Sequence, residues 1–220
     1  MKYVIVTTGK LILGENGMKY EIELDVSAAQ FLNEKVVTVK NSDGKIIISD
    51  LEGKIYFELN GKAINVYRKK NRLFIASNNG CYEISQGKIK VIASEPSVGC
   101  SLNYVLIYRV EDDNIQYILY SRDGRKIDYV SYNKKVLFLG ESRRYAYILQ
   151  GDQIKVCNMK NGCSEKYKLP QEFAIGLIRQ GRILLSDGYN IWEFNLGSRK
   201  FSHLFSLDEL VLSFDFIFSK

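Results

Sequence analysis

Residues that could carry acid–base or nucleophilic chemistry are scarce in this sequence. The one histidine, His203, lies in the alternating run Phe201–Phe205, which is typical of a half-exposed strand. Catalysis of the Ser-His-Asp or Cys-His kind needs a histidine to carry the proton. The densest acidic group, Glu111–Asp113, precedes Asn114 and is typical of a hairpin loop rather than of a glycosidase carboxylate pair. With no phosphate-binding or calcium-binding motif either, we expect no enzyme and no cofactor.

The four cysteines predict no metal site. Cys81, Cys100, Cys157 and Cys163 form no C-x-x-C pair, and with one histidine they supply too few ligands for zinc. Cys157 and Cys163 flank an expected hairpin turn at 158–162, where a disulfide is geometrically feasible. Free thiols are the rule in the cytosol of a mesophile. The composition of this chain, rich in Ile, Lys and Tyr and poor in His and Gln, is typical of thermophiles, whose cytosol tolerates disulfides. The sequence leaves both states open.

Basic residues gather at two turns. Lys and Arg total 31 against 25 Asp and Glu, a net charge of +6. Basic side chains neutralise phosphates and tyrosines stack on unpaired bases, so nucleic-acid binding is one hypothesis. A binding patch must be contiguous in space, and the sequence does not show whether the two turns converge on one face. The candidate binding residues are Arg68, Lys69, Lys70, Arg72, Arg143, Arg144 and Tyr145.

The elements that would position these residues are short β-strands. Runs rich in Ile, Val, Tyr and Phe recur about every ten residues, and each is closed by a Gly, Asn or Asp turn. Helix signals are few; a capping-box spacing predicts one short helix at 27–34. Too little helix is present to cover a parallel sheet, so an α/β fold is excluded. The pattern predicts an all-β meander of hairpins.

A loose repeat runs through the chain. Arg72–Ile84 and Arg182–Phe194 share one plan, in which a basic residue opens a buried strand, a polar turn follows, and an aromatic-acid-apolar strand comes next. Leu185–Phe194 resembles the turn between the second and third strands of a β-propeller blade, and Arg179–Leu207 resembles most of one blade. The resemblance is to β-propellers in general, because no single family's signature is complete.

The resemblance implies a small β-propeller of about five irregular four-stranded blades. Six blades, or a β-sandwich or barrel, are the alternatives. If the ring closes, Leu212–Phe218 should pair with Tyr3–Val6 and remove an exposed sheet edge.

We expect one domain over 1–220 and a cytoplasmic protein, because no long apolar run predicts a membrane span and the first apolar run is too short for a signal peptide. The leading functional hypothesis is a non-catalytic interaction module or scaffold that binds another protein through propeller loops. A nucleic-acid-binding protein and a structural component of a virus or large assembly are the alternatives. The oligomeric state stays open.

Overall fold

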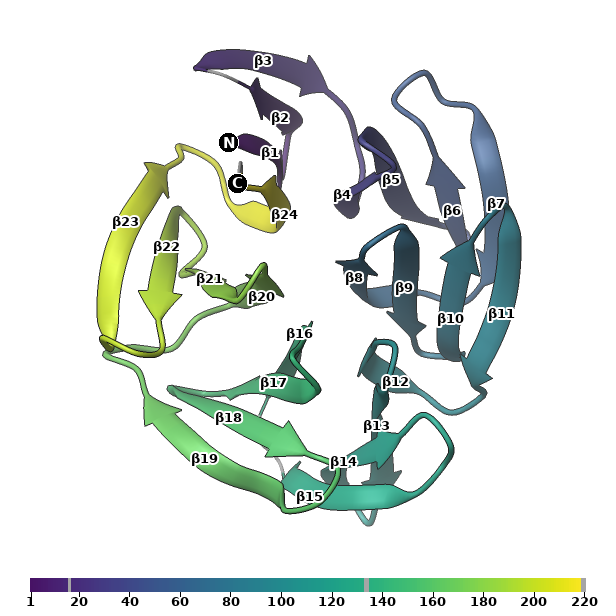
Figure 1. Ribbon diagram of the computed structural model, residues 1–220. Coiled ribbons are helices and arrows are strands. Elements are labelled where there is room, and N and C mark those ends of the chain that lie inside the picture. Colours follow the sequence, from purple (N-terminus) through teal and green to yellow (C-terminus); the bar gives the residue numbers. More distant parts are fainter. Residues whose placement is uncertain (16, 133–134, 219–220) are drawn as a thin grey trace.

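Six antiparallel sheets stand around a central axis as the blades of a propeller (Figure 1). The computed structural model describes residues 1–15, 17–132 and 135–218. Over these ranges it contains 24 strands, four to a blade, and no helix. The all-β class and the propeller resemblance are therefore confirmed. The helix expected at 27–34 is wrong, because this segment holds the strand Ala28–Leu32, which is the innermost strand of a blade.

The first three blades run from the chain's two ends to residue 93. Blade 1 joins the last strand to the first three, blade 2 follows it, and blade 3 carries the first basic turn. From the axis outward, blade 1 is β24 (Val211–Ile217), β1 (Lys2–Thr7), β2 (Lys10–Glu15) and β3 (Met18–Glu23); blade 2 is β4 (Ala28–Leu32), β5 (Lys35–Ser42), β6 (Lys45–Ser49) and β7 (Ile55–Asn60); blade 3 is β8 (Ala63–Lys69), β9 (Arg72–Ser77), β10 (Gly80–Ser85) and β11 (Lys88–Ala93).

The last three blades complete the ring. In blade 4 the second and third strands both have eight residues, and blade 5 carries the second basic turn. Blade 4 is β12 (Ser97–Cys100), β13 (Tyr104–Glu111), β14 (Asn114–Ser121) and β15 (Lys126–Tyr132); blade 5 is β16 (Val136–Ser142), β17 (Tyr145–Gln150), β18 (Gln153–Asn158) and β19 (Gly162–Lys168); blade 6 is β20 (Ile175–Arg179), β21 (Arg182–Ser186), β22 (Asn190–Asn195) and β23 (Lys200–Ser206).

The ring closes between the two chain ends. β24 pairs antiparallel with β1, with Phe216 opposite Tyr3 and Phe214 opposite Ile5. The expected pairing of the C-terminal strand with Tyr3–Val6 is thereby confirmed. Because both long edges of β1 are now hydrogen-bonded, neither is exposed as a template for pairing with other chains.

The count of five blades is wrong, and the six-blade alternative is confirmed. The strands that a search for runs of bulky apolar residues can miss include three innermost ones, each of which contains alanine or glycine. β4 begins with Ala28 and Ala29, β12 contains Gly99, and β20 contains Gly176. Small residues belong there because the inner strands converge on the axis, where neighbouring blades come closest. With 220 residues in six blades, each blade has about 37, fewer than in common propeller repeats.

The core lies between the blades. Buried side chains of blades 3 to 6 form one cluster that includes Phe74, Val105, Leu149 and Ile183. Gly99 of β12 faces Phe138 of β16 so closely that an added Cβ would lie 2.1 Å from the Phe138 Cβ. Blades 4 and 5 can therefore pack at this spacing only if residue 99 has no side chain.

We predict that Gly99→Ala lowers the free energy of unfolding by about 1–3 kcal/mol, because the new methyl group must push Phe138 and its blade outward. Urea unfolding measures the change. Gly197→Ala is the matched control, since an added Cβ there would lie 3.4 Å from the Asn195 Oδ1 atom. Equal stability of the Gly99→Ala variant and the unchanged protein would contradict this packing.

Candidate interaction face

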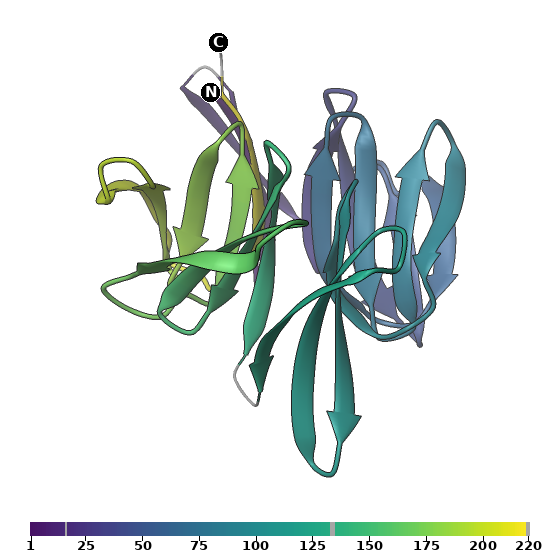
Figure 2. The ribbon, with the colours of Figure 1, turned by 60° about the horizontal axis from the view of Figure 1, so that its bottom comes forward.

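The propeller has two faces with different turns. The inner strands end on one face, here called the upper face, which carries the turns after the first and third strands of each blade. The lower face carries the turns after the second strands and the connections between blades. In Figure 2 the upper face is at the top, and the β13–β14 hairpin extends from the lower face.

A depression of about 390 Å³ lies where the inner strands end, and we call it the upper mouth. The ends of β8, β16, β20 and β24 line it, so four blades contribute to one site. Tyr67, Ile178, Phe216 and Ile217 supply its apolar part. Its basic residues are Arg68, Lys69, Lys70, Arg143 and Arg179.

Asp215 anchors the charges behind the upper mouth. Its carboxylate is fully buried and accepts hydrogen bonds from Arg179 Nε at 2.5 Å and from Arg68 Nε at 3.0 Å. The backbone N–H of Phe31 also donates to it, at 3.0 Å. Burial by itself raises the pKa of Asp215, but the two guanidinium groups more than offset this and hold the pKa below its ordinary value. One carboxylate thus links blades 1, 2, 3 and 6.

Arg179 is a structural cation with all its nitrogens in use. Besides Asp215, its guanidinium donates to the Arg68 carbonyl oxygen at 2.8 Å and to Gln30 Oε1 at 2.6 Å. Its side chain also lies over the ring of Tyr67, 5.0 Å from the centroid. No cluster or motif in the sequence singled this residue out, because it ends an ordinary strand, β20, and becomes notable only when the blades meet.

Glu141 neutralises a second basic residue of the upper mouth. Lys69 Nζ lies 2.6 Å from its carboxylate, and Ser101 Oγ donates to the same group at 2.8 Å. The hydroxyl of Tyr67 donates to the Glu141 carbonyl oxygen at 2.9 Å. Lys69 is therefore held in place by blades 4 and 5 and is not available to a ligand without breaking this ion pair.

Lys70 and Arg143 remain available. Both are exposed, and in the described part of the chain neither side chain has a hydrogen-bond or ion-pair partner. Lys70 lies in the turn after β8 and Arg143 in the turn after β16, yet both line the upper mouth. The two basic turns found in the sequence thus meet on one face.

A second depression, of about 630 Å³, adjoins the first on the upper face, and we call it the side depression. It contains Arg143, Arg144 and Tyr145 of blade 5, together with Lys160 from the turn after β18. Asn103 of blade 4 closes its other side. Arg143 lines both depressions, so the basic surface is continuous between them.

The turn that presents Arg143 and Arg144 is conformationally costly. Both residues have positive φ, 48° and 70°, as a two-residue hairpin of this type requires. Asn-Gly is the usual sequence for such a turn, because side chains with a Cβ are disfavoured there. Two arginines in these positions direct both side chains away from the blade toward solvent.

Arg72 is the one candidate cation that lies outside both depressions. Its Nη1 lies 2.6 Å from Glu83, which also accepts a hydrogen bond from Arg122 of blade 4. Burial raises the pKa of Glu83, but the two arginines outweigh it and the pKa is lowered. Arg72 is therefore paired within blade 3, on the strand beside Glu83, while Arg122 links the same carboxylate to blade 4.

The turns of the two faces differ in charge. On the described residues, upper-face turns carry eight basic and four acidic residues, whereas lower-face turns and connections carry two basic and ten acidic ones. The upper set is Lys54, Lys70, Arg122, Arg125, Arg143, Arg144, Lys160 and Arg199 against Glu34, Asp50, Glu52 and Asp123. The lower set is Lys62 and Lys135 against Asp25, Asp43, Glu95, Asp112, Asp113, Asp152, Glu172, Asp187, Asp208 and Glu209.

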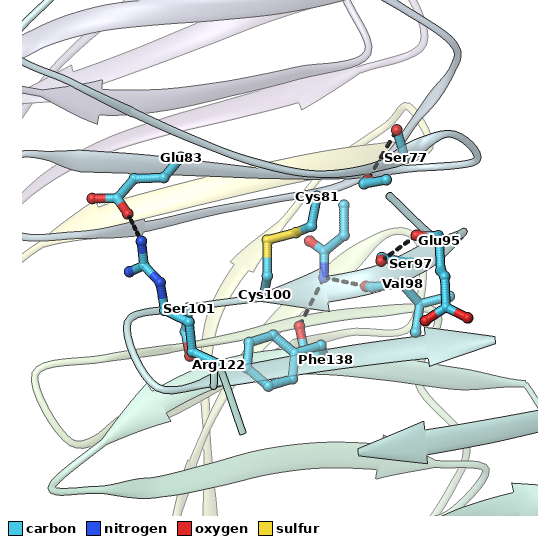
Figure 3. Close-up of a disulfide and its surroundings, with 12 residues drawn as sticks. Ser77, Cys81, Glu83, Glu95, Ser97, Val98, Cys100, Ser101, Arg122 and Phe138 are labelled. Carbon is cyan, nitrogen blue, oxygen red and sulfur yellow. Dashed lines mark hydrogen bonds and ion pairs between the residues drawn. A yellow bond between two sulfur atoms is a disulfide. The ribbon is translucent and has the colours of Figure 1, made fainter. Parts of the chain in front are cut away.

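Both pairs of cysteines are joined as disulfides. Cys157 and Cys163 lie opposite each other on β18 and β19, within blade 5. Cys81 of β10 is joined to Cys100 of β12, which links blades 3 and 4 (Figure 3). The sequence did not suggest this second pair, because its partners are 19 residues apart on strands that do not pair.

The lone histidine lies away from both depressions. His203 lies on the outer strand β23, and its ring packs edge to face with that of Trp192, with 4.8 Å between the ring centroids. Its Nε2 lies 3.0 Å from Ser206 Oγ. On the described residues its ring nitrogen has a hydroxyl partner and no carboxylate partner that would orient it as a base. Over residues 1–15, 17–132 and 135–218, no group of three or more His, Cys, Asp or Glu side chains could hold a metal ion. That same region has no helix long and apolar enough to cross a membrane.

Asp215→Asn should lower the free energy of unfolding at neutral pH by about 3–5 kcal/mol, because Arg68 and Arg179 lose their buried counter-charge. In the unchanged protein the folded-state pKa lies below the unfolded value of about 3.9, so this stabilisation is complete above about pH 4 and is lost as the pH falls through the folded-state pKa. Urea unfolding over this pH range tests both points. Asp208→Asn, at an exposed turn, is the control, and the same acid dependence in both variants would contradict the assignment.

Because all four cysteines are in disulfides, we predict that they react with an alkylating agent only after reduction. Intact mass measured under denaturing conditions, with and without reductant, tests this. Replacing Cys81 and Cys100 by Ala should cost about 1 kcal/mol more stability than replacing Cys157 and Cys163, because the first bridge closes a 19-residue loop and the second a loop of 6. Full alkylation of the unreduced, unfolded protein would refute both bridges.

Comparison with known proteins identifies the architecture and no family. No protein-family model matches the chain, and no curated protein matches it significantly. A solved structure of a Bacteroides caccae protein of unknown function is similar at TM-score 0.63 and 9% identity, covering 97% of each chain. A chain of the nidogen/laminin complex has TM-score 0.61 and 9% identity, with the same coverage. The Neurospora crassa Pan2 WD40 domain has TM-score 0.54 and 9% identity, covering 86% of this chain and 68% of that one. At these identities the likeness shows the fold alone: the chain is a six-bladed β-propeller.

Proposed function

We propose that the chain is a non-catalytic interaction module whose upper face binds an acidic segment of another protein. The observation that carries this proposal is the meeting of Lys70 and Arg143 at the upper mouth, each exposed and without an ion-pair partner. Rigid blades with short turns hold such side chains at fixed positions, which lowers the entropy cost of binding. Two similar structures come from protein complexes, nidogen/laminin and the mitotic checkpoint complex.

The charges of the upper mouth favour an anionic ligand. Five basic residues line it, while Glu141 and the buried Asp215 supply two carboxylates, which leaves three positive charges in excess. The apolar side chains of Ile178, Phe216 and Ile217 lie in the same depression. A segment with both acidic and apolar residues would match this lining, since interfaces combine an apolar centre with polar contacts around it.

A protein partner is favoured over nucleic acid by the number of available cations. A protein that neutralises about 6–10 phosphates needs that many available cations, whereas on the described residues the upper mouth and side depression offer four without ion-pair partners: Lys70, Arg143, Arg144 and Lys160. Arg68 and Lys69 are already paired with Asp215 and Glu141. Tyr145 is 40% exposed beside Arg144, so single-stranded nucleic acid is the competitor that the binding test must include.

The paired cysteines bear on where the protein works. Disulfides persist in oxidising compartments and are rare in the cytosol of mesophiles. A cytoplasmic location, as expected from the sequence, fits two disulfides only if the organism is a thermophile of the kind that tolerates them. We propose an oxidising compartment as the other location. Fractionation of the native source, with the alkylation experiment above applied to each fraction, shows in which compartment the bridged protein lies.

Lys70→Glu/Arg143→Glu should weaken binding of a fluorescent Glu-rich peptide by at least about tenfold at low salt, because both available cations of the upper mouth are reversed. Fluorescence anisotropy with a salt titration measures the affinity. Lys62→Glu/Lys135→Glu is the matched control, with the same charge change at exposed positions of the lower face.

An equal loss in the control would mean that net charge, and not the upper mouth, governs binding. Competition by single-stranded DNA, with a steep loss of affinity on added salt, would replace the protein partner by nucleic acid. Absence of any binding in the unchanged protein would remove the proposal.

A further inference from the structure

We propose that copies of this chain stack head to tail, with the β13–β14 hairpin of one copy docked in the side depression of the next. This inference rests on the proposed function, because it names a partner for the same basic face. Two features carry it: the β13–β14 hairpin on the lower face and the side depression on the upper face. They are complementary in charge and in apolar character, and their positions allow contact between stacked copies.

The hairpin projects beyond its blade. β13 and β14 have eight residues each, but β12 pairs with β13 only as far as Ser97 opposite Ile107. On the other side, β15 pairs with β14 only from Gln116 onward. Among the residues that the structure describes, no strand pairs with the tip between these limits, and Figure 2 shows the hairpin extending below the ring. Val110 near the tip is 65% exposed.

The tip is acidic and partly apolar. Glu111, Asp112 and Asp113 form its turn, and Val110 precedes them. No basic side chain is ion-paired with these three acids on the described part of the chain. Arg109, the nearest cation in the sequence, is paired with Glu95 at 2.7 Å.

The side depression has the complementary character. Arg143, Arg144 and Lys160 line it, and no acidic residue does. Tyr145 and Met159, 40% and 36% exposed, are its apolar residues. In the proposed contact between two copies, three acids and one exposed valine of the hairpin would therefore meet three cations and two exposed apolar side chains of the depression.

The positions also agree. The hairpin belongs to blade 4 and leaves the lower face, while the side depression lies between blades 4 and 5 on the upper face. Two copies stacked along one axis, related by a small rotation, would bring these features together. The remaining turns support this orientation, since a lower face with ten acids and two bases meets an upper face with eight bases and four acids.

The contact uses different surfaces of the two copies. It is therefore heterologous, and each added copy leaves one free hairpin and one free depression. Assembly should proceed beyond dimers and should weaken with salt, because its attraction is mainly electrostatic.

Sedimentation velocity at low salt over a range of protein concentrations tests the stacking. We expect species larger than dimers that dissociate as salt is added. Asp112→Lys/Asp113→Lys and Arg143→Glu/Arg144→Glu should each be monomeric alone, and mixing them should restore association because one competent contact is re-formed. Asp43→Lys/Asp208→Lys is the matched control, with the same charge change on other lower-face turns.

A second variant guards against misfolding. Asp112 and Asp113 have positive φ, 49° and 63°, which Asn tolerates better than Lys. Asp112→Asn/Asp113→Asn should therefore keep the turn and still weaken association at least tenfold.

Three results would overturn the inference: an unchanged protein that stays monomeric at low salt, assembly that stops at dimers, or assembly that survives both hairpin variants. Binding of the Glu-rich peptide separates this failure from that of the proposed function. A monomeric protein that still binds the peptide would refute stacking alone, and a protein that neither binds nor assembles would refute both.

Discussion

Closure of the ring by β24 is the constraint on which the rest of the structure depends. The last strand of the chain pairs with the first, so blade 1 is complete only when the chain ends meet. Asp215 lies on this closing strand and is bound by Arg68 of blade 3, Arg179 of blade 6 and the Phe31 N–H of blade 2. Because a buried carboxylate without partners is very unfavourable, this network specifies how the closing strand sits against three other blades.

The same convergence produces the candidate site. Six inner strands approach one axis, and close packing there requires residues such as Gly99 and Gly176 where a side chain would collide with Phe138 or Leu139. Where these strands end, their last residues come together from blades far apart in the sequence. Arg68 and Arg179 are 111 residues apart, yet Arg179 donates to the Arg68 carbonyl oxygen. Structural cations therefore lie directly behind the exposed ones, Lys70 and Arg143.

Paired and unpaired cations on this face have different roles. Lys69 and Arg179 each have a carboxylate partner on another blade and help to hold blades together, whereas Arg72 is paired with Glu83 on the adjacent strand of its own blade. Lys70, Arg143 and Arg144 lie in turns, and no carboxylate of the described ranges is ion-paired with them. Only the second group keeps its charge available to a ligand, which is why the proposals rest on the turns and not on the strand ends.

Much of the fold could be predicted from residue types. Alternating apolar runs separated by turns such as Asp187-Gly188 indicated an all-β meander, and Leu185–Phe194 marked the second and third strands of a blade, now β21 and β22. The blade number could not be read correctly, because β4, β12 and β20 contain small residues in place of bulky ones. Their composition is dictated by contacts across the axis, which no local pattern records.

The sequence by itself determined the class of fold, the ring closure and the two basic turns, because strand periodicity and turn chemistry are local properties. Tertiary structure alone decided that the two turns share a face, that Arg72 is committed to Glu83, and that Arg179 completes the site. It also brought Cys81 to Cys100 across two blades. The Arg72–Glu83 pair depends on the pairing of β9 with β10 within blade 3. The other three have one physical reason: each depends on how the blades pack around the axis, and that packing joins residues from separate parts of the chain.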